Sequence, residues 1–402
     1  MSEYQYYEFH ALDRRLTESE MADIRTLSSR VALTSTSAIF TYHFGDFRGR
    51  PESVLEKYFD AMLYTANWGT RRLMFRFPKG LANTGAIEPY CIPDIIILKT
   101  TNEHVILDIF INEEGGDWID EDEVQLAGMI PLRDAILAGD YRALYLAWLR
   151  ACELELGPAD AGDDLEEDEE DDEDAGAEGY YGLRGSGGFL HRATPEPPVP
   201  PNLGHLNGAL EAFTDFFEID PLWIEAAAKA SAAVSKPDEP VERWIASLPE
   251  ADCRRLLLRA ARGEPNIALS IMNELREQFA EPPRPVGPGK RRTAGELLAI
   301  VQERRRRAAE EKRRQAEVAR IRRLDDLAKR ETAAWTEVLA SIQQRNAKGY
   351  DQAVILLREL RELAAHRGEQ AAFQQRVEQL AAQFHTLPGL RSRMVEARLI
   401  VK

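Results

Sequence analysis

The sequence has little cysteine: Cys91, Cys152 and Cys253 are its only three, and they lie far apart. An odd and widely spaced set gives no disulfide framework and no zinc-site spacing. No apolar run approaches the ~20 residues that a membrane-spanning helix needs. The N-terminal segment, MSEYQYYEFH, lacks the basic start and apolar core of a signal peptide. These absences predict a soluble, cytoplasmic protein that neither binds a structural metal nor associates with a membrane.

Catalytic motifs are also missing. The sequence contains no HExxH and no GxSxG. Gly289-Lys290-Arg291 lacks the first glycine and the Ser or Thr of a phosphate-binding loop, and Gly185-Ser186-Gly187-Gly188 does not match the dinucleotide fingerprint. The acid-dense stretch 117–123 lacks the alternating Asp and central Gly of a calcium loop. The sequence therefore predicts a non-enzymatic protein without a cofactor.

One enzymatic alternative rests on a pair of expected strands. Asp94, Lys99, Glu103 and Asp108 lie on or beside these strands, as do the carboxylates and lysine of Mg²⁺-dependent nucleases. The acid-x-Lys triplet of such sites is absent, because Asp108 is followed by Ile109 and Phe110. Solvated or structural charge is the favoured interpretation of this group.

Acidic charge is concentrated in one stretch. Residues 160–178 contain thirteen Asp and Glu and no Lys or Arg, in a chain with a net charge of −17. Glycine-rich residues 182–188 and proline-rich residues 194–201 follow. Like charges repel and apolar residues are sparse, so this composition cannot form a core. We interpret 157–201 as a disordered linker between two halves of the chain.

The first half, residues 1–156, predicts an α+β domain with a mostly antiparallel sheet covered on one side. Residues 72–77 alternate, with Leu73, Phe75 and Phe77 on one face and Arg72, Met74 and Arg76 on the other. Residues 95–99 and 105–111 form a hairpin signal. The other expected elements are strands at 4–9 and 34–44, helices at 17–29 and from Pro51 to Asn67-Trp68-Gly69, and two helices within 126–156 broken near Gly139-Asp140.

The second half predicts only helices. We expect a small helical bundle at 202–280, a proline-rich linker at 281–292, a long charged helix at 293–348 and a helical hairpin at 349–402. The expected core of the bundle is Trp223, Trp244, Leu256, Leu257 and Ile267. In the hairpin, His366-Arg367-Gly368 joins two amphipathic helices, which we expect to pack on an apolar stripe around Trp335.

The long helix carries the strongest basic charge. Residues 284–330 hold sixteen Lys and Arg against seven Asp and Glu, a net of +9. No large apolar residue lies between Gln302 and Gln315, so this part has no coiled-coil seam. A basic helix can bind phosphate backbones in a strongly salt-dependent way. The alternative is a solvated helix whose charges pair along its own surface, for example Glu303 with Arg307.

Aromatic and arginine residues also gather in the expected strands. Exposed aromatics interleaved with arginines can stack bases and hold phosphates, whereas alternation predicts that many of them pack the sheet. This group comprises Tyr4, Tyr6, Tyr7, Trp68, Arg71, Arg72 and Arg76. The candidate residues for binding nucleic acid or a partner are Arg304, Arg305, Arg306, Arg307, Lys312, Arg313, Arg314, Arg320, Arg322, Arg323, Trp68 and Arg71.

Several motifs resemble known bacterial sequences. The N-terminal YQYYEF, the EKYFD of 56–60 and the NWGT of 67–70 are similar to a bacterial protein family of unassigned activity. The segments 350–354 and 360–363 resemble the tails of bacterial SWIM-type zinc-finger proteins. The zinc-binding Cys and His pattern of those proteins is absent here, so the resemblance implies no metal site. It implies at most a partner in a shared complex, for instance a SWIM-type zinc-finger protein.

Two functional hypotheses follow. In the first, the chain is an adaptor or scaffold subunit of a bacterial intracellular complex. It binds a protein partner through the N-terminal domain or the C-terminal helices, which the long helix holds apart. In the second, it is an accessory protein that binds nucleic acid through the basic helix, with the acidic linker as an internal competitor. The sequence favours the first, and nucleic-acid binding is the alternative.

Overall fold

The computed structural model of the chain describes residues 4–45, 47–113, 125–157, 189–233, 240–264, 266–279 and 291–400. The chain divides into an N-terminal unit, Met1–Arg304, and a C-terminal unit, Arg305–Lys402. The acid-rich run 160–178, the glycine-rich segment 182–188, the acid-dense stretch 117–123 and residues 284–290 lie outside the described residues. The same holds for most of the linkers expected from the sequence.

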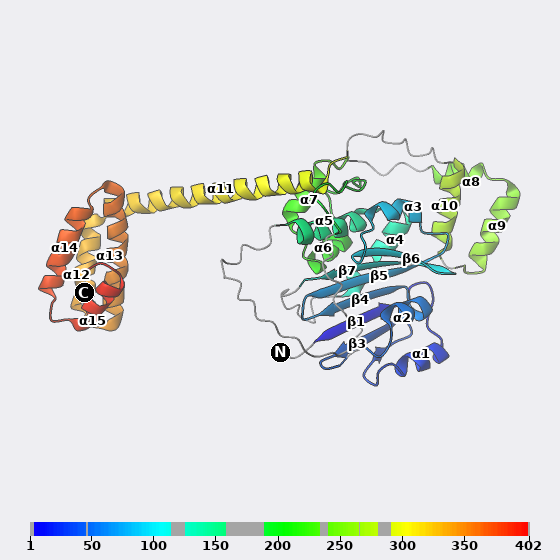
Figure 1. Ribbon diagram of the computed structural model, residues 1–402, viewed down its shortest axis with the longest axis horizontal. Coiled ribbons are helices and arrows are strands. Elements are labelled where there is room, and N and C mark those ends of the chain that lie inside the picture. The colour runs from blue at the N-terminus through cyan, green and yellow to red at the C-terminus, as the bar shows by residue number, and fades with distance from the viewer. Residues whose placement is uncertain are drawn as a thin grey trace, which may run out of the picture. The chain divides into compact units, whose positions relative to one another are not determined.

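A seven-stranded sheet organises the N-terminal unit, and every strand pair in it is antiparallel. Its order is β2-β3-β1-β4-β5-β7-β6, which places β4 and β5 at the centre (Figure 1). The strands are β1 (Gln5–His10), β2 (Ala32–Leu33), β3 (Ser37–Tyr42), β4 (Ala61–Ala66), β5 (Thr70–Pro78), β6 (Ile96–Thr100) and β7 (His104–Asn112). The antiparallel α+β fold predicted for this part of the chain is therefore confirmed.

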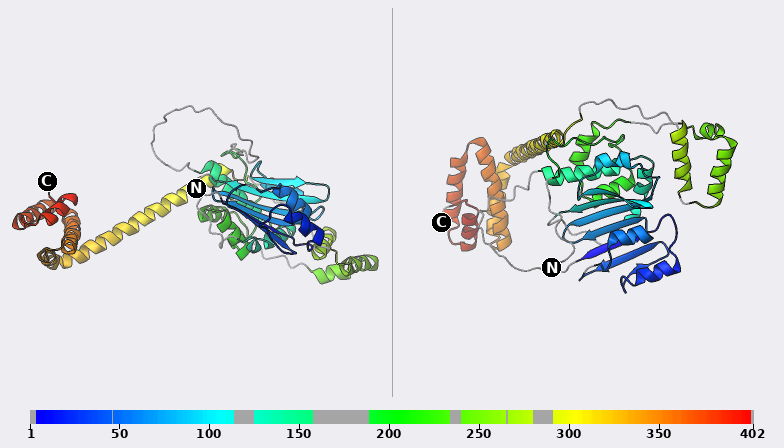
Figure 2. Two further views of the ribbon diagram at one scale, coloured as in Figure 1. Left: turned by 90° about the horizontal axis from the view of Figure 1, so that it is seen from below. Right: turned by 45° about the vertical axis from the view of Figure 1, so that its right-hand side comes forward.

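Helices cover both faces of the sheet rather than one (Figure 2). Side chains on both faces of the strands are buried. Phe9, Met62 and Met74 pack on one face, while Leu63 and Leu73 pack on the other. On the first face lie α1 (Glu18–Arg25) and α2 (Pro51–Tyr58). On the second lie α3 (Thr84–Ile87), η1 (Glu88–Tyr90), η2 (Leu126–Gly128), α4 (Pro131–Leu137), α5 (Arg142–Leu156), α6 (Gly208–Phe216) and α7 (Pro221–Ala228).

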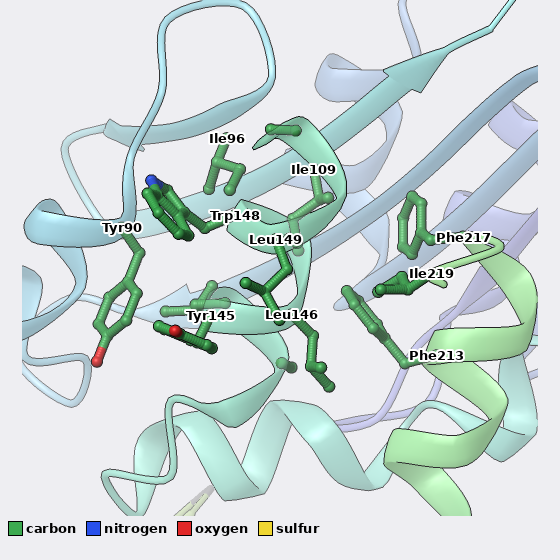
Figure 3. Close-up of a cluster of buried hydrophobic side chains, with 14 of the residues drawn as sticks. Tyr90, Ile96, Ile109, Tyr145, Leu146, Trp148, Leu149, Phe213, Phe217 and Ile219 are labelled. Carbon is green, nitrogen blue, oxygen red and sulfur yellow. The ribbon is translucent and has the colours of Figure 1, made fainter. Parts of the chain in front are cut away.

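The larger core lies between the sheet and α5. Tyr145, Trp148 and Leu149 of α5 are buried together with Ile96 and Ile109 of the sheet. Figure 3 shows this cluster. It also includes Phe213 of α6 and Phe217 and Ile219, which directly follow that helix. Residues on both sides of the predicted linker thus share one core. The expected bundle at 202–280 is therefore not a separate body, because Trp223 and its neighbours belong to this core.

Strand β4 is the element that the sequence did not predict. The sequence pattern predicts one helix from Pro51 to Asn67, whereas α2 ends at Tyr58 and β4 begins at Ala61. All six residues of β4 are buried, because the strand is central and both of its faces are covered. A central strand of this kind has a continuous apolar run instead of an alternating one, which resembles a helix in periodicity.

The segment 189–201, expected to be disordered, is folded against the N-terminal unit. The buried Glu196 accepts hydrogen bonds from Arg292 at 2.7 and 2.8 Å and a short one from the Tyr145 hydroxyl. The Tyr90 hydroxyl donates to the Pro198 carbonyl at 2.7 Å. The prediction of disorder was based on amino-acid composition, which contains no information about hydrogen-bond partners far away in the sequence. The segment has no core of its own, and specific polar contacts with the rest of the unit hold it in place.

Gly295 provides a test of this junction. A Cβ added there would lie 2.7 Å from the Arg192 carbonyl oxygen. Gly295→Ala is therefore expected to destabilise the N-terminal unit by about 1–3 kcal/mol, although alanine ordinarily favours a helix by about 1 kcal/mol. Gly208→Ala is the matched control, because no atom lies within 4 Å of its added Cβ. Calorimetric unfolding should show opposite signs for the two variants; equal stabilisation would contradict the packing of 189–201.

Three further helices, α8 (Val241–Ala246), α9 (Glu250–Ala261) and α10 (Ile267–Phe279), contact one another. Leu256 and Leu275 are buried, and Trp244 stacks on Phe279. Leu257, which we expected in the core, is 70% exposed. It follows Leu256 by one position, so the two side chains point in different directions around the helix.

The C-terminal unit is entirely helical in its described residues, as predicted. Its helices are the greater part of α11 (Ala294–Lys329), α12 (Glu331–Gln343), α13 (Ala347–Arg367), α14 (Gln370–Gln383) and α15 (Pro388–Glu396). Trp335, Val338, Leu357, Phe373 and Val377 form its core. Gly368, in the left-handed conformation with φ of 72°, ends α13 and begins the turn to α14. The hairpin therefore packs on the stripe around Trp335, as expected.

The long helix is shorter than predicted. It ends at Lys329, and α12 begins after Arg330, whose φ of −116° and ψ of 19° are not helical. No glycine or proline marks this position. Leu324 and Leu327 of α11 are buried in the same core as Trp335 of α12. The break allows the apolar residues of α11 and those of α12 to be buried in the same core. The local helix propensity of the sequence does not indicate the break.

Candidate functional site

The arginines predicted in the strands of the N-terminal unit are buried. Arg71 is 1% exposed and pairs with Glu218, and two of its nitrogens have no hydrogen-bond partner among the described residues. Tyr7 is 1% exposed and stacks on Phe47. Trp68, in the turn between β4 and β5, is 41% exposed. The group therefore packs the sheet for the most part, and Trp68 alone offers an exposed ring.

Two ion pairs cross the face of the sheet that α1 and α2 cover. Arg72 of β5 donates to both carboxylate oxygens of Asp108 on β7, at 2.8 and 2.7 Å, and to Glu52 of α2 at 2.5 Å. Arg72 and Asp108 are both buried. The pairing follows from strand register, because Arg72 lies opposite Phe110, two positions from Asp108, which places both side chains on the same face of the sheet. These contacts occupy the carboxylate that a metal-dependent nuclease would require.

Asp60 joins the second group of buried charges. One carboxylate oxygen accepts from Arg76 at 2.7 and 3.2 Å, and the other accepts from the backbone N–H groups of Leu12 and Asp13 at 2.7 and 3.0 Å. Arg133 lies 3.9 Å away and binds Asp13 through two hydrogen bonds. Burial opposes ionisation of Asp60, but Arg76 and the backbone donors outweigh it and lower its pKa. Asp60 is therefore a structural centre of charge.

Two cysteines of the N-terminal unit are not activated. Burial raises the pKa of Cys91 to about 11, and burial also raises the pKa of Cys152. A thiolate is the reactive form of cysteine, so a raised pKa makes these thiols inert near neutral pH. Among the described residues, no group of three or more His, Cys, Asp and Glu is placed to hold a metal ion. Over the same residues, no helix has both the length and the apolar character to cross a bilayer.

Helix α11 provides the most exposed charge in the described chain. Its first turns are buried in the N-terminal unit at Ala294, Leu297 and Val301, and its last turns are buried in the C-terminal unit at Leu324 and Leu327. Every residue from Arg306 to Arg323 is exposed. Within 303–323 the sequence has ten Lys and Arg and four Glu. The helix therefore presents a basic surface along its middle section.

The charges of this section are not spread evenly around the helix. At about 100° of rotation per residue, five cations fall within an arc of about 100°; this basic face comprises Arg305, Lys312, Arg313, Arg320 and Arg323. Two small residues, Ala309 and Ala316, lie in the middle of the arc. The four acids of the section lie outside it, at Glu303, Glu310, Glu311 and Glu317. One side of the helix is therefore purely basic.

Some of these cations pair with neighbouring acids at the surface. Arg320 lies 3.2 Å from Glu317, and Arg323 lies 2.6 Å from Glu362 of α13. All four side chains are about half exposed, and exposed pairs of this kind stabilise a protein by only about 0–1 kcal/mol. A phosphate therefore competes readily for the same arginines. Lys312 and Arg313 have no paired carboxylate among the described residues.

The predicted site residues thus fall into separate groups. The ten cations from Arg304 to Arg323 lie on one helix, and five of them share the basic face, whereas Arg304 is half-buried and pairs with Glu225 of α7. Arg71 lies on β5 of the N-terminal unit, and Trp68 lies in the turn between β4 and β5. The sequence reasoning counted charges and did not assign them to sides of the helix. The heptad spacing of Glu303, Glu310 and Glu317, and of Arg313 and Arg320, contains that information.

A groove in the C-terminal unit was not predicted. It has a volume of about 90 Å³ and lies between α12, α13 and α14. Its floor is apolar, with Trp335, Leu360, Leu363 and Phe373. The guanidinium of Arg376 lies 4.0 Å from the centre of the Trp335 ring, a cation–π contact that leaves its N–H donors at the surface. The groove therefore combines an apolar floor with the exposed cation of Arg376 and with two lining carboxylates, Glu331 and Glu369.

Compared with protein-family models, with curated proteins and with solved structures, the chain matches none.

Proposed function

We propose that the chain is a non-enzymatic accessory protein that binds the phosphate backbone of nucleic acid through the basic face of α11. The observation that supports this most strongly is the segregation of charge. Five cations share one side of an exposed helical section, and its four acids lie elsewhere. A helix stabilised only by its own ion pairs needs no such segregation, because pairs at i,i+4 work on any side.

The other described charges support the same assignment. The arginines of the sheet are buried and pair with Asp108, Asp60 and Glu218, so they serve the fold. By contrast, the cations of α11 from Arg306 to Arg323 are exposed, and the pairs of Arg320 and Arg323 lie at the surface. Lys and Arg that neutralise phosphates release condensed counterions, which makes binding favourable at low salt. The exposed section of α11 is therefore suited to polyanions.

A titration of the full chain with a fluorescently labelled 20-base-pair DNA duplex tests this function. With five contacts to phosphate, we expect an anisotropy change with a Kd in or below the micromolar range at about 50 mM salt. The complex should dissociate when salt is raised to about 0.5 M. No anisotropy change at low salt and high protein concentration would contradict the proposal.

A second candidate function is that of a protein adaptor, and the groove beside Trp335 favours it. An apolar side chain of a partner fits its floor, and a carboxylate of the same segment can pair with Arg376.

Ala372 lines this groove and is exposed. Ala372→Arg is expected to fill the groove and abolish capture of a partner from the native host. Gln379→Arg, on an exposed position of α14 that does not line the groove, should capture the same partner. Equal capture by both variants would exclude the groove.

A further inference from the structure

We infer that the basic face of α11 prefers double-stranded to single-stranded nucleic acid; this inference depends on the function proposed above. Three features of the described helix support it: the absence of aromatic side chains, the arrangement of the cations in two rows, and the exposure of the section on all sides. Each concerns a different property of the ligand.

The first feature is the composition of α11. From Ala294 to Lys329 the helix contains no Phe, Tyr or Trp. Proteins that bind single strands combine a basic groove with aromatic side chains on which the unpaired bases stack. The basic face offers no such ring, so unpaired bases gain nothing from contact with it. Its interactions are confined to phosphates, which a duplex displays on both of its strands.

The second feature is that the cations form two rows with a small-residue stripe between them. Arg305, Lys312 and Arg323 lie along one edge of the face. Along the other edge lie Arg313 and Arg320, while Ala309 and Ala316 occupy the middle. An α-helix with side chains is about 10–12 Å across, and the major groove is about 12 Å wide. With alanine in the middle, the helix can approach the floor of the groove while each row reaches one backbone.

A single strand cannot use this arrangement fully. It has one line of phosphates, which engages one row of cations and leaves the other solvated. At about 50 mM salt each additional phosphate contact raises affinity roughly tenfold. Two rows engaged in place of one therefore favour the duplex by at least about tenfold.

The third feature is access. All residues from Arg306 to Arg323 are exposed, including those on the side opposite the basic face, such as Val318 at 44%. A groove encloses a helix on more than one side, so it requires a section without neighbouring elements. Within the described residues of its unit, this section of α11 meets that requirement up to its last turn, where Arg323 contacts Glu362 of α13.

The test titrates the full chain into a labelled 20-base-pair duplex and, separately, into one of its strands, both at about 50 mM salt. The strand has a sequence without self-complementarity, so that it stays single-stranded. We expect the duplex to bind at least about tenfold more tightly. Ala309→Phe with Ala316→Phe should lower this ratio toward one, because the rings block the groove and offer stacking to unpaired bases. Gln315→Phe with Val318→Phe, at two positions outside the basic face, should leave it unchanged.

The outcomes separate the two proposals. Equal affinities for duplex and single strand would overturn the duplex preference while phosphate binding stands. A ratio that survives Ala309→Phe with Ala316→Phe would also overturn it, because the preference would then reflect charge density alone. Failure of both ligands to bind would contradict the proposed function itself.

Discussion

Asp60→Ala is expected to lower the free energy of unfolding of the N-terminal unit by about 3–5 kcal/mol, the usual cost of removing one partner of a buried ion pair. Asp60 is 1% exposed. Its removal leaves the Arg76 guanidinium buried without a carboxylate and leaves the backbone N–H groups of Leu12 and Asp13 without their acceptor. Since domains are stable by only about 5–15 kcal/mol, the variant should unfold well below the wild-type temperature in calorimetry.

The same group predicts how stability depends on pH. The folded-state pKa of Asp60 lies below the ordinary value of an aspartate, so the unfolded chain binds its proton more readily. Its contribution is then fully present above about pH 4–5 and is lost as the pH falls through the folded pKa. Glu52, whose pKa is lowered by Arg72 against the opposing effect of burial, acts in the same direction. The wild type should lose stability steeply in acid, and Asp60→Ala should lose less.

Asp23→Ala is the control for this prediction. Asp23 also pairs with a cation in the N-terminal unit, but the pair with Lys57 has a distance of 3.5 Å and both side chains are more than half exposed. Asp23 also accepts a 3.0 Å hydrogen bond from the Tyr58 hydroxyl, so its removal should cost about 1–2 kcal/mol, still well below the cost at Asp60. If the two variants lose equal stability, Asp60 is not the centre of charge that its contacts indicate.

The second large effect concerns the basic face. Replacing Arg305, Lys312 and Arg313 with glutamine should weaken duplex binding at about 50 mM salt by at least about 100-fold, since each lost phosphate contact costs roughly tenfold. Glutamine has a helix propensity close to those of Arg and Lys, so α11 should remain helical by circular dichroism. The loss should therefore come from binding and not from unfolding.

A second triple variant on the same helix controls for net charge. Arg307, Arg314 and Arg322 lie on the side opposite the basic face, so replacing them with glutamine removes the same three charges. This variant should lose no more than about a tenth as much affinity as the first, through the general reduction of the field. Equal losses would show that α11 acts through its total charge and has no dedicated face.

Much of the fold was predictable where a pattern is local. The start of the helix predicted from residue 17, where Thr17 and Glu20 form a capping box, is a local signal. The strand alternation from Arg72 to Phe77 and the turn at Gly368 likewise report the structure of their own segments. Strand β4 was missed because burial on both faces removes the alternation that identifies a strand. The break at Arg330 was missed because the packing of Leu324 and Trp335 into one core decides it.

The candidate site was predictable in part for the same reason. A count of Lys and Arg located the basic helix, and helical geometry assigns those charges to sides once the helix is established. The structural roles of Arg71, Arg72 and Arg76 were not predictable from the sequence. Their carboxylate partners, Glu218, Asp108 and Asp60, lie in other segments of the chain. The groove beside Trp335 likewise depends on three helices meeting.

The salt dependence of duplex binding tests the central claim most directly. Five phosphate contacts by the basic face predict a slope of about −4 to −5 for log Kobs against log salt concentration. The Arg305, Lys312 and Arg313 variant should reduce this slope to about −2, and the Arg307, Arg314 and Arg322 variant should leave it close to the wild-type value. A slope near zero, or one that the two variants change equally, would contradict the assignment of phosphate binding to this face.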